Sequence, residues 1–287
     1  MALNLGGGSL SSGFSTLQLG NAQAMLTQSL MRLSSGQRIN SPSDDPGGLA
    51  VSMKLKHAAT VTEATKRNVD NALSFTDTQD SALESVADVL DRMSTIQVSY
   101  GSGTATTTDK AAYASEFKEL QKQLNAFMSE TFNSMSLFST TSNSKSVYIS
   151  TSGNQGASIS ISSLNLSGAL SISGSINLGS AATTAAAITI SSISIADITS
   201  VINQVASLRA TSGATASRLQ FSSDFLDTSK TNLEAANSRI MDVDIAEEVT
   251  NYAKYNVQVY AASAALAQAN LNMGIVLDLL NLSSSRR

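Results

Sequence analysis

The sequence lacks several of the residue types from which catalytic and metal sites are usually built. Its 287 residues include no cysteine and no tryptophan, a single histidine and two prolines. Without cysteine there is no disulfide framework, no thiolate metal site and no cysteine nucleophile. The scarcity of proline is compatible with long helices, because a proline inside a helix interrupts it.

Charged and aromatic residues are also scarce. Only 14% of the residues are charged and 5% are aromatic, and the net charge is -4. This slightly acidic balance gives no electrostatic reason to bind nucleic acid, which requires a basic surface. We therefore expect no nucleic-acid partner.

The charges are missing from both ends of the chain. No charged residue precedes Arg32, so the first residues lack the positive segment that a secretory signal peptide needs. Apolar residues recur there at heptad spacing in two rows, on different sides of the expected helix. One row is Leu10, Leu17, Ala24 and Met31, with Phe14 beside it, and the other is Leu19, Leu26 and Leu33. Two apolar rows on one helix predict two packing partners.

The C-terminal stretch 245–280 has the most regular heptad pattern, which predicts a helix that lies against another helix. No charged residue occurs between Tyr255 and Leu277, so this helix should be buried on all sides, in protein or in a membrane. A membrane would hold its amide side chains in lipid at a cost of roughly several kcal/mol each, so we expect enclosure by protein and no membrane insertion. The main row is Ile245, Tyr252, Val259, Leu266, Met273 and Leu280, and the interleaved row is Val249, Asn256, Ser263, Asn270 and Leu277.

Three more helices are expected between these ends. Gly36 predicts the end of the first helix, and Asp44 or Asp45 can cap a second helix with Pro46 in its first turn. Asp109 is the expected cap of a third. The predicted ranges are 46–98, 109–127 and 197–240, and in the first of these the residues expected to be buried are Leu55, Thr62, Val69, Thr76, Leu83 and Leu90 with Ala72, Gln79, Val86 and Met93.

The stretch 146–196 has a different pattern. It has no charge, is dense in serine and threonine, and carries apolar pairs spaced by two residues, which predicts short strands of a small antiparallel β unit. A disordered serine-rich loop is the alternative, although regular isoleucine disfavours it. The pairs are Ile159 and Ile161, Leu164 and Leu166, Leu170 and Ile172, Ile176 and Leu178, and Ile188 and Ile190.

No enzyme or metal site is convincing. Ser115 and Lys118 have Ser-x-x-Lys spacing, but the companion motifs of that enzyme class are missing. The carboxylates at 242–248 lack the glycine and ligand spacing of a calcium loop and fit the start of a helix better. His57 has no second ligand nearby in sequence. We therefore expect a protein that is not an enzyme and has no cofactor or metal.

Two longer motifs, one near each end, are more specific. The first is the run Leu33-Ser-Ser-Gly-Gln-Arg-Ile-Asn40, followed by Asp44-Asp45 and Gly47-Gly48-Leu49-Ala50, and the second is Ser238-Arg-Ile-Met-Asp-Val-Asp-Ile-Ala-Glu-Glu248. With Ala267-Gln-Ala-Asn270 and Val276-Leu-Asp-Leu-Leu280 they resemble the terminal signatures of bacterial flagellins, in the expected order. The resemblance covers roughly the first 140 and the last 90 residues.

This resemblance implies a structural subunit of the extracellular filament that propels swimming bacteria. The implied fold is mainly α, a long antiparallel coiled-coil rod formed by the N- and C-terminal halves with a small inserted β-rich outer region. The implied segments are 1–42 and 242–287 for an inner coiled-coil domain, 43–140 and 197–241 for a helical rod domain, and 141–196 for the variable outer region.

The resemblance also implies an interface in place of an active site. The residues expected to pack between or within subunits are Leu10, Phe14, Leu17, Leu26, Leu33, Arg38, Ile39, Asn40, Ile240, Ile245, Tyr252, Val259, Leu266, Met273, Leu277 and Leu280. Arg92 matches a residue through which some flagellins contact a vertebrate innate immune receptor. Ser94 and Thr95 stand where a second Arg and a Glu are usual, so we expect weak recognition.

The implied partners are further copies of the chain, the flagellar export apparatus, an export chaperone that binds the C-terminal helix, and the filament cap and hook-junction proteins. The implied location is secreted and extracellular. The alternative within the superfamily is a hook–filament junction protein, but the central region is small and both signatures are complete. A coiled-coil scaffold or adhesin would need charged flanks on its terminal helices, and these are absent.

Overall fold

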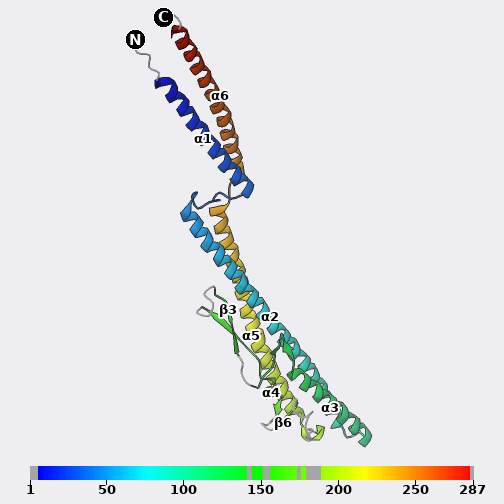
Figure 1. The fold of residues 1–287 in the computed structure, drawn as a ribbon. Coiled ribbons are helices and arrows are strands. Elements are labelled where there is room, and N and C mark those ends of the chain that lie inside the picture. The colour runs from blue at the N-terminus through cyan, green and yellow to red at the C-terminus, as the bar shows by residue number, and fades with distance from the viewer. Residues whose placement is uncertain (1–5, 141–143, 151–155, 173–175, 179–188, 285–287) are drawn as a thin grey trace. The chain divides into compact units, whose positions relative to one another are not determined.

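The computed structural model describes residues 6–140, 144–150, 156–172, 176–178 and 189–284, and of residues 6–12, 176–177 and 276–284 it describes the backbone alone. The chain divides into two compact units (Figure 1). Residues 1–57 and 233–287 form what we call the terminal unit, and residues 58–232 form the central unit.

The chain is mainly helical, as predicted, with a few short strands between its two helical halves. The helices are α1 (Gly6–Ser35), α2 (Pro46–Tyr100), α3 (Thr107–Met128), α4 (Leu166–Ala169), α5 (Ile195–Met241) and α6 (Ile245–Ser284), with a 3₁₀ turn at Ile190–Ser192. The strands are β1 (Thr131–Phe132), β2 (Met135–Ser136), β3 (Ser144–Tyr148), β4 (Ser158–Ser162), β5 (Ser171–Ile172) and β6 (Ile176–Asn177).

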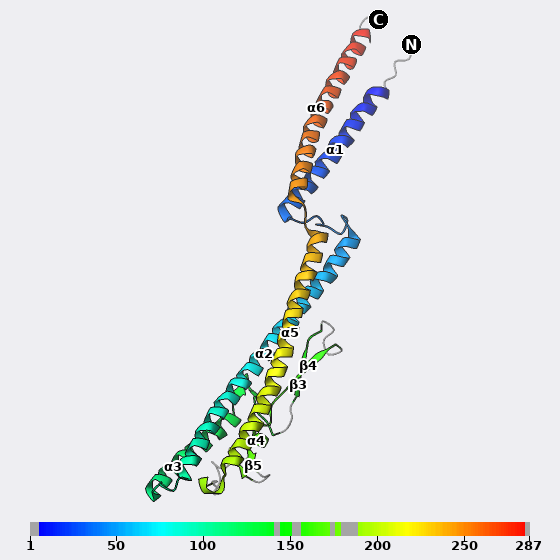
Figure 2. The same ribbon diagram turned by 180° about the vertical axis from the view of Figure 1, so that it is seen from behind.

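In the terminal unit α1 and α6 lie side by side and run antiparallel (Figures 1 and 2). The residues that turn toward the partner helix are buried or half-buried and recur at steps of three or four, which is the pattern of a coiled-coil seam. On α1 this seam consists of Ser15, Leu19, Ala22, Leu26, Ser29 and Leu33, and on α6 of Glu248, Tyr252, Tyr255, Val259, Ala262, Leu266 and Ala269.

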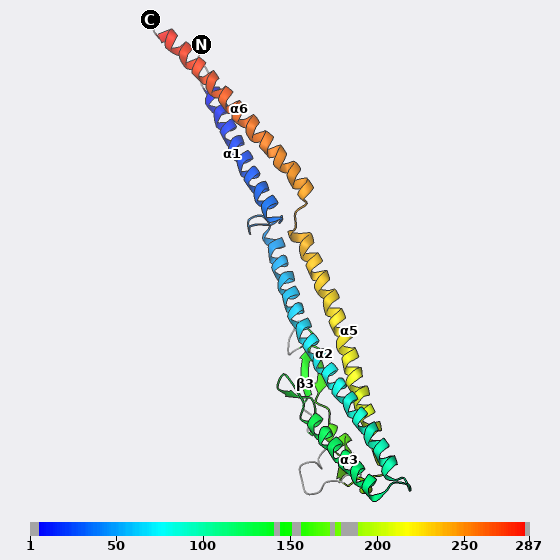
Figure 3. The same ribbon diagram turned by 90° about the vertical axis from the view of Figure 1, so that its right-hand side faces the viewer.

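In the central unit α2 packs along α5, with α3 beside it (Figure 3). The two predicted rows of α2 are confirmed from Thr62 onward, because Thr62, Val69, Thr76, Leu83 and Leu90 are buried together with Ala72, Gln79, Val86 and Met93, whereas Leu55 is half-buried. Polar bonds tie the two helices at intervals. Arg209 Nε donates to Asp80 Oδ1 at 3.0 Å, and Ser223 Oγ donates to Asp70 Oδ1 at 2.8 Å.

The predicted β unit is confirmed in part. β3 and β4 form an antiparallel hairpin from Ser144 opposite Ser162 to Tyr148 opposite Ser158, and β5 pairs with β6. However, Leu164 forms an isolated β-bridge with Phe138, Leu166 begins the helical turn α4, and Ile190 begins a 3₁₀ turn, so no regular strand forms at Leu164–Leu166 or at Ile190. A single pair of apolar residues gives too short an alternation to establish a strand. Ile188 lies outside the described residues.

The apolar residues of this segment belong to the core of the central unit. Ile159, Ile161, Leu166 and Leu170 are buried in the same cluster as Leu83 of α2 and Leu219 of α5. The segment 141–196 is therefore packed on the helices, at least through its described residues. The implied domain boundaries remain a prediction. The helix breaks lie near them, but the terminal unit extends to residue 57 and resumes at residue 233.

The third helix begins differently from the prediction. Its N-cap is Thr106, and Asp109 is the third residue inside, forming a capping box in which each side chain binds the other's backbone N–H. The Thr106 hydroxyl also donates to Asp109 Oδ2 at 2.7 Å, and this bond, followed by the one from the Thr106 backbone N–H, lowers the pKa of Asp109. Ser194 and Asp197 repeat the arrangement at the start of α5.

Candidate assembly surface

One of the two predicted rows of α1 faces α6 and the other is uncovered. Leu19, Leu26 and Leu33 are half-buried on the seam. On the other side Phe14 is 64% exposed and Leu17 68% exposed. Ala24 and Met31 are exposed as well, and we call these four residues the outer row of α1. The side chain of Leu10 lies outside the described residues.

The main predicted row of α6 is partly on the seam. Tyr252, Val259 and Leu266 are half-buried against α1, whereas Ile245 and Met273 are exposed. The side chains of Leu277 and Leu280 lie outside the described residues.

The interleaved row of α6 differs from the prediction by one residue. The seam takes Glu248, Tyr255, Ala262 and Ala269, which follow the residues of the main row by three. Of the predicted row, Asn256 is half-buried, whereas Val249, Ser263 and Asn270 are exposed. On a helix, the positions three and four residues after a main-row residue both lie next to it, so spacing alone does not show which of the two is on the seam. The observed choice buries tyrosine and alanine and leaves a serine and an asparagine in water.

A further row on α6 is apolar and uncovered, and the heptad pattern did not predict it. Every residue of it is exposed, with Tyr260 at 71% and Leu271 at 64%. At 3.6 residues per turn these positions form one stripe about 80° wide. Counting by threes and fours from Val249 would have found it. We call it the outer row of α6; it consists of Val249, Ala253, Val257, Tyr260, Ala264, Ala267, Leu271 and Ile275.

An open groove runs between α1 and α6. Its volume is about 560 Å³, and small residues line its α6 side. Phe14 and Met25 line it from α1, and Ala261 and Ala265 line it from α6. Side chains from another molecule could enter it.

Two exposed phenylalanines on α5 were also missed. Phe221 is 72% exposed and Phe225 69% exposed, one turn apart on the central unit. They lie off the buried face of α5, which includes Leu219 and Leu226. In the sequence, the feature that could have indicated this surface is two phenylalanines that lie outside the buried row of the helix.

The joint between the helices of the terminal unit holds the remaining predicted residues. Arg38 donates from its backbone N to Met241 O at 2.5 Å and from Nη2 to Ile240 O at 2.9 Å. Val243 N donates to Gly36 O at 3.1 Å, next to an antiparallel bridge between Gln37 and Asp242. These bonds connect the segment after α1 to the break between α5 and α6.

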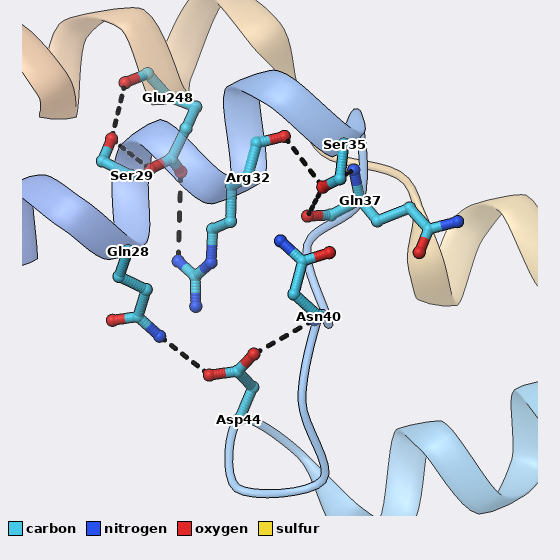
Figure 4. Close-up of polar contacts among 8 residues, drawn as sticks. All are labelled: Gln28, Ser29, Arg32, Ser35, Gln37, Asn40, Asp44 and Glu248. Atoms are coloured by element: carbon cyan, nitrogen blue, oxygen red, sulfur yellow. Dashed lines mark hydrogen bonds and ion pairs between the residues drawn. The ribbon is translucent and has the colours of Figure 1, made fainter.

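Asp44 fixes the turn that precedes α2. Its Oδ2 accepts from the backbone N–H groups of Asn40 and Ser41, both at 3.0 Å, and its Oδ1 accepts from Gln28 Nε2 at 2.9 Å (Figure 4). The bonds from Asn40 and Ser41, and then the one from Gln28, hold the pKa of Asp44 below its usual value. Asn40 therefore acts here through its backbone.

The predicted helix stop and cap are confirmed at this joint. Gly36 has a φ of +70°, the left-handed conformation that ends a helix. Asp45 caps α2 by accepting from Gly48 N at 2.8 Å. A Cβ on Gly48 would collide with the Asp45 side chain and lie 2.8 Å from Ile39 Cδ1, and Ile39 is buried, so the turn requires glycine.

A buried polar cluster lies on the seam above the joint. Ser29 is 1% exposed and donates from Oγ to Glu248 Oε1 at 2.5 Å; Glu248 is 5% exposed (Figure 4). Arg32 Nη1 lies 3.9 Å from Glu248 Oε2, and Arg32 Nε is buried without a hydrogen-bond partner.

The other charged candidates serve the local structure. Asp244 Oδ1 accepts from Ala246 N at 2.9 Å and so caps α6, as expected of carboxylates at a helix start. Within the part of the chain that the structure describes, no group of three or more metal-ligating side chains could hold a metal ion. Arg92 Nη2 is 2.6 Å from Glu116 Oε1, and the receptor contact stays a prediction.

Comparison with known proteins agrees with this architecture. The bacterial flagellin N-terminal helical region matches residues 14–143, and the bacterial flagellin C-terminal helical region matches residues 195–280. A flagellin of Listeria monocytogenes is 31% identical over 265 residues, which are 89% of this chain and 92% of that one. A flagellin of Halalkalibacterium halodurans is 30% identical over 254 residues, 88% of this chain and 91% of that one.

A solved structure shares the fold. The structure of a putative flagellar hook-associated protein from Vibrio parahaemolyticus matches with a TM-score of 0.58 at 15% identity, over 69% of this chain and 100% of that one. At this identity the likeness concerns the fold alone, and the sequence relatives are flagellins. None of the helices in the described ranges is long and apolar enough to cross a membrane. The chain belongs to the bacterial flagellin family and is a structural subunit of the flagellar filament.

Proposed function

We propose that the outer rows of α1 and α6 are the surfaces through which copies of this chain pack together in the filament. The observation that carries this proposal is the outer row of α6, an exposed apolar stripe on a helix without charge from Tyr255 to Leu277. A monomeric protein rarely exposes so continuous an apolar stripe, and such a stripe usually marks an interface.

The packing residues of the terminal helices and of the joint then divide into three roles. Phe14, Leu17 and the outer row of α6 contact neighbouring copies. Leu26, Leu33, Tyr252, Val259 and Leu266 hold α1 against α6, so that both outer rows are presented together. Arg38, Ile39, Asn40 and Ile240 hold the joint from which the two helices extend.

The energy of such a contact is sufficient for assembly. Burying one leucine, isoleucine or valine side chain contributes about 1.5–3 kcal/mol. The two outer rows contain several such residues, so each subunit gains this energy only when neighbours cover both rows. Polymerisation is therefore cooperative, and an isolated subunit gains little from its terminal helices.

We also propose where the remaining segments of the chain lie in the filament. Residues 1–42 and 242–287 form the inner layer of the filament, 43–140 and 197–241 the rod outside it, and 141–196 the outward-facing part. The chain acts outside the cell after passage through the flagellar export apparatus. An export chaperone would cover the apolar α6 before assembly, and cap and hook-junction proteins would contact the ends of the filament.

The substitution Leu271→Asp tests the proposal, with Asn272→Asp as its matched control. Leu271 lies on the outer row of α6, whereas Asn272 is its exposed neighbour on the face that also carries Glu247 and Lys254. In the filament Leu271→Asp should cost about 3 kcal/mol or more per subunit, from lost burial and a desolvated carboxylate. In the monomer it should cost almost nothing.

The measurement is sedimentation and electron microscopy of purified protein under polymerising conditions. We expect soluble, helical Leu271→Asp monomers that form no filaments, and filaments from Asn272→Asp. Filament formation by Leu271→Asp at the level of the parent would contradict the proposed packing.

A further inference from the structure

The apolar part of the seam between α1 and α6 does not by itself determine how the two helices align. Leu19, Leu26 and Leu33 repeat every seven residues on α1, as Tyr252, Val259 and Leu266 do on α6. If α6 slid by one heptad, about 10 Å, each of these side chains would again meet an apolar side chain. The repeat therefore permits several alignments of similar energy.

The polar cluster on the seam breaks this degeneracy. Ser29 Oγ donates to Glu248 Oε1 at 2.5 Å, and Arg32 Nη1 lies 3.9 Å from Glu248 Oε2 (Figure 4). Ser29 and Glu248 are buried, and the seam positions around them are mostly apolar. Only one alignment places the carboxylate against both the hydroxyl and the guanidinium.

A slipped alignment would be penalised at this point. Glu248 would face apolar side chains, or Ser29 would face Tyr255, and a buried carboxylate would lose its partners. An unpaired buried charge is much more costly than the net gain of pairing it, so such groups select a geometry more than they stabilise it. Polar residues at core positions set the alignment of coiled coils in this way.

We propose that Ser29, Arg32 and Glu248 are positioning residues that select the alignment of α1 on α6. They thereby determine how the outer rows of the two helices are offset when they meet neighbouring copies. The inference rests on the proposed function, since the offset matters only if both outer rows contact other subunits. The backbone bridge between Gln37 and Asp242 lies outside the seam, and the experiment must separate its effect from that of the cluster.

Disulfide trapping can report the alignment, because the chain has no cysteine of its own. Ser15→Cys with Ala262→Cys reports the observed alignment, since both residues line the groove between the helices. Ser15→Cys with Ala269→Cys, or with Tyr255→Cys, reports a slip of one heptad in either direction. Intramolecular crosslinks are scored in filaments as monomer bands of altered mobility.

The test variant is Ser29→Ala/Arg32→Met/Glu248→Leu, which replaces the whole cluster by apolar side chains and keeps the bridge. We expect filaments in which the ratio of slipped to observed crosslinks rises about tenfold or more over the parent. Glu247→Leu is the matched control, because it removes an exposed carboxylate beside Glu248, and its ratio should equal that of the parent.

An unchanged ratio in the triple variant would show that the bridge holds the alignment unaided, and would overturn the proposal. If the triple variant fails to polymerise, Glu248→Gln decides, because it keeps the side-chain shape. It should raise the ratio by a smaller factor, and an unchanged ratio would again overturn the proposal. Failure of the proposed function would appear separately, as filaments formed by Leu271→Asp.

Discussion

The two units of the chain differ in where their large apolar side chains lie. In the central unit Leu83, Leu90, Met93 and Leu219 are completely buried in one cluster. In the terminal unit the seam is only half-buried along most of its length, and large side chains such as Leu17 and Tyr260 are exposed. The core of the central unit is complete within one molecule, although Phe221 and Phe225 of α5 are exposed, whereas the terminal unit has the surface of a structure that is completed by other copies.

Charge explains the difference. Charged residues flank the contact between α2 and α5, where Arg209 pairs with Asp80 and Lys66 with Asp227, so the borders of that contact are suited to water. The outer rows of α1 and α6 contain no charged residue. A helix with a charged outer face needs one partner, and a helix without one needs partners on two sides.

The largest effect on the isolated chain is expected from Leu83→Ala in the central unit. Leu83 is fully buried, so the substitution leaves a cavity and should lower the free energy of unfolding by about 2–5 kcal/mol. Denaturant unfolding of the monomer measures this loss. A loss below about 0.5 kcal/mol would mean that the core of the central unit is loose as well.

The same substitution in the terminal unit, Leu17→Ala, should act on the filament instead. Leu17 is exposed in the chain, so the stability of the monomer should change by no more than about 0.5 kcal/mol. If neighbours bury Leu17, the filament loses about 1–2 kcal/mol per subunit, and the concentration needed for polymerisation rises about 5- to 30-fold. An unchanged critical concentration would remove Leu17 from the proposed interface.

A smaller effect is expected at the turn between β1 and β2 in the central unit. Asn133 and Ser134 have φ values of 47° and 64°, the left-handed conformation of a two-residue hairpin turn. Glycine adopts it without strain, so Ser134→Gly should raise the unfolding free energy by about 1 kcal/mol. Ser136→Gly, in the adjoining strand, should lower the unfolding free energy. If Ser136→Gly were more stable than Ser134→Gly, backbone strain at Ser134 would be excluded.

The smallest effect is expected at Asp44. The fold lowers the pKa of this carboxyl, so its ionised form stabilises the native state above the ordinary pKa of 3.8. That contribution is lost as the pH falls through the lowered native value. The difference in stability between the parent and Asp44→Asn should therefore shrink on acidification from pH 5, which unfolding at several pH values can follow. If the difference in stability between the parent and Asp44→Asn stayed constant with pH, the lowered pKa of Asp44 would be contradicted.

The sequence predicted best the parts whose packing partners lie within the chain. Both buried rows of α2 were predicted, because each heptad position meets a partner helix from the same molecule. The stop at Gly36 and the cap at Asp45 were predictable from local turn chemistry.

What the sequence could not predict depended on choices between similar local patterns. The seam of α6 uses Ala262 and Ala269 where the spacing equally allowed Ser263 and Asn270. Leu166 and Ile190 begin helical turns, although their spacing resembled that of strands. Phe221 and Phe225 follow no buried row, so only the three-dimensional arrangement shows them exposed.

The central claim is that neighbouring copies cover the outer rows of the terminal helices, and thiol labelling tests it most directly. Val257→Cys places a single cysteine on the exposed outer row of α6, and Ser160→Cys places one on the exposed side of β4. In monomers both thiols should react rapidly with a water-soluble maleimide. In filaments Val257→Cys should react at least tenfold more slowly, while Ser160→Cys remains reactive. Equally rapid labelling of Val257→Cys in monomers and filaments would contradict the claim.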